Sequence, residues 1–176
     1  MYLTKRVNVK NYEYSKKQYQ VNVLEDGKPK LGVTPEKIKG IEIDVAYWRK
    51  FNALHSWFVN NYANGVDDCR PVYVSEDTLV ELVGVLRNVK EKLDNSKLVK
   101  KTIKTWNGEI DEIDVYECEE EVTELFSPQS GFFFGSTEIN EWYKNDVIYA
   151  IEVFEEILKE EELNGNDGEY YYEASW

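Results

Sequence analysis

The chain has 176 residues, a formal net charge of −13 and two cysteines. A chain this acidic repels nucleic acid and anionic membranes at long range, and no apolar run approaches the roughly 20 residues that span a bilayer. Two cysteines make no disulfide framework, and no secretory leader begins the chain. We therefore expect a cytoplasmic protein with reduced thiols that binds neither nucleic acid directly nor a membrane.

The first third of the chain predicts two strands and a long helix. Residues 1–9 alternate apolar and polar side chains, and residues 19–24 form a second extended run before the turn signal Asp26-Gly27. Residues 41–62 have the period of an amphipathic helix that Gly65 ends.

The middle of the chain predicts a capped helix and a charged hairpin. Ser75 is a typical N-cap for a second helix that reaches Asp94-Asn95. Residues 98–106 and 109–116 flank Asn107-Gly108, which is the strongest short hairpin signal. The first of these strands is rich in lysine and the second in carboxylates, which favours their pairing.

The last third predicts a short helix over residues 120–126, an aromatic strand over 131–135 and a final strand over 170–176. Between these strands, Thr137 is the expected cap of a long helix that ends near residue 163. We therefore predict a single α+β domain over residues 1–176. Three main helices pack on a small, mostly antiparallel sheet, with a charged β-hairpin around Asn107-Gly108.

Charge is unevenly distributed along the chain. Residues 1–108 carry 19 Lys and Arg against 13 Asp and Glu, whereas residues 109–176 carry 2 against 21. The C-terminal part thus has a net charge of −19. It fits a basic partner, although a solvated helix face is the more common reason for such carboxylates. Those expected on the last helix are Glu141, Glu152, Glu155, Glu156, Glu160, Glu161 and Glu162.

Two blocks of sequence resemble a family of small proteins encoded by tailed phages and prophages of Gram-positive bacteria. One block runs from Ala46 to Val59 and contains a YWRKxNxxHxWFV pattern, and the other, PQSGFFFGST, starts at Pro128. The ends of the chain, Met1 to Arg6 and Tyr171 to Trp176, are similar to those of the family as well. The resemblance implies a phage-encoded protein that acts in the cytoplasm of an infected bacterium. It implies no reaction and no active site.

One face of the predicted helix over residues 41–62 is a candidate binding site. Trp48, Asn52 and His55 follow one another at four- and three-residue intervals, with Arg49 about 100° around the helix. Together these groups can bind a planar ring, and His55 can also act as a general acid or base. Ser136 and Thr137 precede the last helix, where free N–H groups suit a phosphate. The same residues also fit a partly buried helix face and an ordinary strand-to-helix turn.

We predict a phage accessory protein, active against a bacterial defence, that binds a small nucleotide-like ligand through Trp48, Arg49, Asn52, His55, Ser136 and Thr137. The alternative is an acidic inhibitor, such as a nucleic-acid mimic, of a basic surface on a host or defence protein. A hydrolase that uses His55 ranks third, because no nucleophile motif accompanies the single histidine. The run Asp67-Asp68-Cys69 lacks spaced metal ligands, so we predict no metal and no cofactor.

Overall fold

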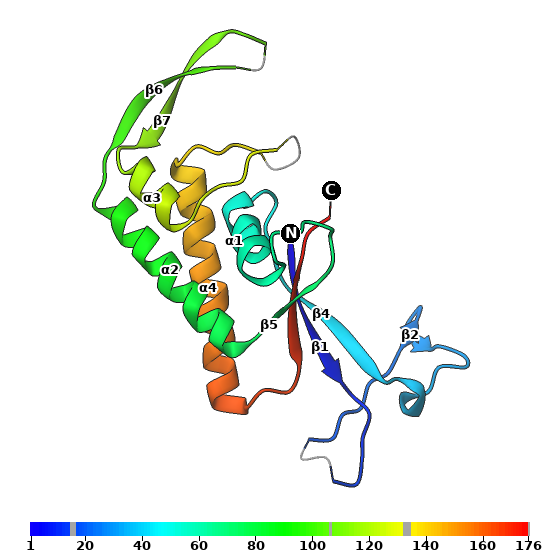
Figure 1. Cartoon of the computed structure of the whole chain (residues 1–176). Coiled ribbons are helices and arrows are strands. Elements are labelled where there is room, and N and C mark those ends of the chain that lie inside the picture. The colour runs from blue at the N-terminus through cyan, green and yellow to red at the C-terminus, as the bar shows by residue number, and fades with distance from the viewer. Residues whose placement is uncertain (15–16, 106, 132–134, 176) are drawn as a thin grey trace.

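The computed structural model describes residues 1–14, 17–105, 107–131 and 135–175. Its strands are β1 (Tyr2–Asn8), β2 (Leu24–Glu25), β3 (Lys28–Pro29), β4 (Gly40–Tyr47), β5 (Val72–Val74), β6 (Leu98–Lys104), β7 (Ile110–Tyr116) and β8 (Glu169–Glu173). Its α-helices are α1 (Asn52–Tyr62), α2 (Glu76–Asp94), α3 (Glu119–Leu125) and α4 (Glu141–Asn164), and a 3-10 turn covers Pro35–Lys37. The predicted α+β class is confirmed (Figure 1).

The main sheet has the strand order β4-β1-β8-β5, and each neighbouring pair is antiparallel. The first and last strands of the chain therefore pair with each other, with Leu3 opposite Tyr172. Alternation along the strands divides the side chains between two faces. Leu3, Val74, Tyr170 and Tyr172 point to the helix side and belong to the core. In the described part of the chain, the α-helices lie away from the opposite face (Figure 1).

Helices α2 and α4 lie side by side, and each contributes several side chains to the core (Figure 1). On α2 the apolar side chains recur at three- and four-residue intervals and face the core. The buried ones are Leu79, Leu82, Val83, Leu86, Val89 and Leu93. Ser75 caps this helix as predicted, because its hydroxyl accepts the N–H of Thr78 at 3.1 Å. Within the described ranges, no helix combines the length and apolar character that crossing a bilayer requires.

The hairpin β6–β7 is confirmed and extends away from the body of the molecule (Figure 1). Its register places Lys100 opposite Asp114, and the two charges lie 2.9 Å apart. Lys101 forms a second ion pair, at 2.5 Å, with Glu119 at the start of α3. The lysines of β6 thus compensate nearby carboxylates.

The helix predicted over residues 41–62 is wrong in its first half. Residues 40–47 form β4, which pairs with β1 along its whole length, and α1 begins only at Asn52. Ile41, Ile43 and Val45 are β-branched and alternate with polar residues, so this stretch fits a strand as well as a helix. Pairing with β1 decides between the two. Trp48 consequently precedes α1 and does not share a helix face with Asn52 and His55.

The predicted start of the last helix is also wrong. Asn140, not Thr137, caps α4, because its side-chain oxygen accepts the N–H groups of Trp142 and Tyr143. The aromatic strand predicted over residues 131–135 falls largely outside the described residues, because these exclude 132–134. Trp176, the end of the predicted last strand, also lies outside them. The strand predicted over residues 19–24 is reduced to the two-residue β2, although Asp26-Gly27 does form the turn to β3.

Candidate functional site

The three aromatic and polar groups of the predicted ligand site are all buried. Trp48, Asn52 and His55 have exposed fractions of 2%, 3% and 3%. The indole of Trp48 packs against the rings of Tyr149 and Phe154, with centroid distances of 5.7 Å in both cases. These groups therefore lie within the packed interior of the protein.

Two members of the predicted site do come together. The side-chain N–H of Asn52 donates to the backbone carbonyl of Ser136 at 2.7 Å, which ties α1 to the segment before α4. Ser136 and Thr137 themselves are exposed, as is Arg49. The hydroxyl of Ser136 contacts the carboxylate of Glu138, whose charge disfavours a phosphate there. Asn140 caps α4, so the N-terminus of that helix lies three residues beyond Thr137. The anion site predicted at Ser136 and Thr137 stays a prediction.

His55 joins the sheet to the loop that follows α1. Its Nδ1 lies 3.1 Å from the hydroxyl of Tyr172, and its Nε2 lies 3.2 Å from a carboxylate oxygen of Asp67. A carboxylate beside Nε2 favours the tautomer protonated there, so that Nδ1 accepts the Tyr172 O–H. Burial lowers the pKa of His55 below its usual 6.5, although Asp67 opposes this shift. The imidazole is thus uncharged at neutral pH, and it links Tyr172 of the sheet to Asp67 of the loop.

The space beside His55 is too small for a nucleotide. The cavity lined by His55, Asp67 and Tyr172 has a volume of about 20 Å³. That volume holds roughly one water molecule, whereas small-molecule sites usually have about 300 Å³ or more. Among the neighbouring loop residues, Asp68 pairs with Arg70 at 2.5 Å. No group of three His, Cys, Asp or Glu side chains in the described part of the chain is placed to hold a metal ion.

Comparison with known protein families, with curated proteins and with solved structures finds no match for this chain. We therefore infer the candidate site from the exposed side chains of this chain alone.

Helix α4 presents one continuous exposed stripe, which we call the α4 stripe. The exposed positions recur every three or four residues, so they lie within about 100° of the helix circumference. Trp142 is 80% exposed at one end, although so large an apolar side chain is usually covered. The stripe consists of Glu141, Trp142, Asn145, Tyr149, Glu152, Glu156, Lys159, Glu160 and Leu163.

Several carboxylates elsewhere in the acidic half are neutralised within the protein. Glu155 pairs with Arg87 of α2 at 2.7 Å, and Glu121 of α3 contacts Lys92. Among the described residues, Glu152, Glu156, Glu160 and Glu162 form no ion pair. Negative charge that the protein does not compensate itself therefore collects on α4.

The last turn of α4 opposes the helix dipole. The C-terminus of a helix carries partial negative charge and favours cations, yet this turn contains Glu161 and Glu162, directly after Glu160, and no basic residue. Glu161 is also buried, and burial raises its pKa. Both of its side-chain oxygens lack a hydrogen-bond partner among the described residues. The exposed Glu162 is therefore expected to lower the stability of this helix end, as residues of binding surfaces often do.

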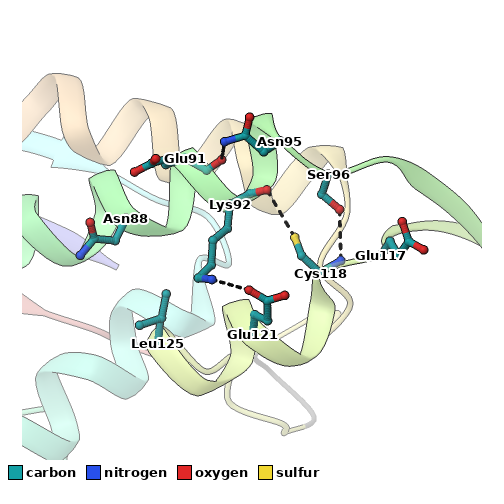
Figure 2. Close-up of a pocket in the computed structure, with 9 residues that line it drawn as sticks. All are labelled: Asn88, Glu91, Lys92, Asn95, Ser96, Glu117, Cys118, Glu121 and Leu125. Carbon is teal, nitrogen blue, oxygen red and sulfur yellow. Dashed lines mark hydrogen bonds and ion pairs between the residues drawn. The ribbon is translucent and has the colours of Figure 1, made fainter.

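A concavity between α2 and α3 is also acidic (Figure 2). Its volume is about 670 Å³, and three carboxylates line it, those of Glu91, Glu117 and Glu121. Figure 2 shows Lys92 directed at Glu121, and the thiol of Cys118 directed at the carbonyl of Lys92 at 3.7 Å. With three carboxylates against one ammonium group, this groove also favours a cationic guest.

Asp146 gives α4 a pH-dependent contribution to stability. It is half-buried, and burial raises its pKa from 3.8 to about 6. Its favourable contribution is therefore fully present below about pH 4 and is lost as the pH rises through about 6. We expect Asp146→Asn to increase the free energy of unfolding at about pH 7 by roughly 1–2 kcal/mol, less than the full shift implies because the group is partly exposed.

Denaturant unfolding from about pH 4 to pH 7 measures this effect. The exposed Glu152→Gln, on the same helix, is the control for the loss of one negative charge. Equal gains from both variants, or a gain from Asp146→Asn that persists at pH 4, would contradict the prediction.

Proposed function

We propose that this chain is an interaction protein whose acidic C-terminal half binds a basic surface of another protein. The resemblance to phage proteins suggests that the partner is a host or defence protein, which the chain would inhibit. The α4 stripe is the main support, because it combines an exposed tryptophan with carboxylates that the protein leaves without ion pairs.

The chemistry of the stripe fits such an interface. Tryptophan is the residue type most enriched among the energetically dominant residues of protein interfaces. Glu152, Glu156 and Glu160 are four residues apart, so they rise about 6 Å per step along the helix axis. A row of charges at this spacing suits a basic groove, including one that otherwise holds nucleic acid.

A nucleotide-like ligand at Trp48, Asn52 and His55 has less support. Those side chains are buried, and the cavity of about 20 Å³ beside His55 leaves no room for a nucleotide. A ligand there would first have to separate packed elements of the core.

Capture from lysate of a Gram-positive host tests the proposal. The immobilised chain should retain a basic protein at low salt and lose it as ionic strength rises, because exposed charges are screened. We expect Trp142→Ala to weaken this binding at least tenfold, because it removes the anchor of the stripe. Tyr14→Ala is the control, since Tyr14 is 83% exposed but lies in the N-terminal half. A retained set of proteins that is the same for both variants would contradict the proposal.

A further inference from the structure

The sheet face opposite the helices carries a second cluster of exposed aromatic side chains, which we call the tyrosine face. Tyr2 pairs with Tyr47 across β1 and β4, and Tyr73 pairs with Tyr171 across β5 and β8. Tyr2, Tyr47 and Tyr73 are 37%, 51% and 53% exposed. Tyrosine is favoured at binding surfaces because its ring is rigid, large and polar at its tip.

One end of the tyrosine face already holds a cation. The guanidinium carbon of Arg6 lies 4.3 Å from the ring centroid of Tyr171, and its Nε lies 2.6 Å from a carboxylate oxygen of Glu42. An aromatic face on one side and a carboxylate on another is an arrangement that binds guanidinium well. The protein thus contains its own example of arginine recognition on this face.

The other end repeats the rings and the carboxylates of this arrangement. The rings of Tyr2 and Tyr47 are 5.0 Å apart. Glu173 lies opposite Tyr2 in the register of β1 and β8, and Asp44 is the next residue of β4 on the same face. Neither carboxylate lies within ion-pair distance of a cation among the described residues, and Glu173 interacts only at longer range with the Met1 ammonium group and with Arg6.

A polar group beneath the same face has no partner. Thr4 lies between these strands, opposite Asp44 and Tyr171, and is only 3% exposed. Its hydroxyl has no hydrogen-bond partner among the described residues. Buried hydroxyl groups are normally paired, so an N–H donor that entered this end of the face would find an acceptor there.

We propose that Tyr2, Tyr47, Asp44 and Glu173 form a site for an arginine side chain of the basic partner. The proposed function supplies the charge of this partner, whereas the site itself stands on the geometry of the tyrosine face. Guanidinium fits better than ammonium, because its planar fork can stack on a ring and donate to a carboxylate at the same time. The α4 stripe and this site would then be two contacts with one basic protein.

Side-chain NMR of the tyrosines tests the site without the partner. The probe is N-acetylarginine amide in physiological salt, and the neutral isostere N-acetylcitrulline amide is its control. Tyr2→Phe and Tyr47→Phe assign the two resonances, and the exposed Tyr14 reports non-specific binding. We expect arginine, but not citrulline, to shift Tyr2 and Tyr47 and to leave Tyr14 unchanged.

Charge variants complete the test. Asp44→Asn should weaken arginine binding at this pair about fivefold, whereas Asp111→Asn on the distant hairpin should have no effect. No shift at Tyr2 and Tyr47, or equal shifts at all exposed tyrosines, would overturn the inference. Because the partner is absent from this experiment, its result is independent of the capture experiment. Arginine binding can be absent while the α4 stripe still binds the partner, and arginine can bind although no partner is captured.

Discussion

Replacing His55 with alanine is expected to lower the free energy of unfolding by about 3–4 kcal/mol. The imidazole is 3% exposed and lies within hydrogen-bonding distance of Tyr172 and 3.2 Å from Asp67. Its removal leaves a cavity and also leaves the buried Tyr172 hydroxyl without a partner. Denaturant unfolding at about pH 7 measures the loss.

Tyr172→Phe is the matched comparison, because it removes only the hydroxyl and should cost about 1 kcal/mol. Burial lowers the pKa of His55, so its contribution is present above pH 6.5 and is lost as the pH falls through the lower folded-state value. This acid sensitivity should be absent from His55→Ala. A loss below about 1 kcal/mol, as for an exposed side chain, would show that His55 is not part of the packed interior.

The elements that the sequence predicts best are those whose local signals agree. The helix α2 has a serine cap, acidic residues in its first turn and a regular apolar stripe, and the structure contains all three. The hairpin β6–β7 has a turn dipeptide between strands of opposite charge. Residues 41–47 differ because their apolar side chains fit two periods at once. Only the pairing of β4 with β1, a contact between distant parts of the chain, makes this segment a strand.

The candidate site follows the same rule. Trp48, Asn52 and His55 are residue types found both in pockets and in cores, and their partners Tyr149, Ser136 and Tyr172 are distant in sequence. No local pattern could predict that these contacts would close the space. The helical period does indicate the exposure of Trp142 and the burial of Glu161. Glu161 lies one heptad after Phe154 and two heptads after Val147, on the buried side of α4.

Replacing Glu156, Glu160 and Glu162 with glutamine is expected to change stability and binding in opposite directions. Glu160 and Glu162 lie close to the C-terminal end of the helix dipole, and all three charges repel their acidic neighbours, so the triple variant should be about 1 kcal/mol more stable. The same variant loses three exposed carboxylates of the acidic surface. We expect its affinity for the basic partner to fall at least tenfold at low salt.

The most direct test of the acidic interaction surface is the affinity of the captured partner for the wild-type chain and for this triple variant, measured at low and at high ionic strength. We expect the wild-type chain to bind the partner at least tenfold more tightly than the triple variant at low salt. At high salt we expect a smaller difference between the two affinities. Equal affinities at low salt, for a variant that unfolding measurements show to be folded, would contradict this expectation.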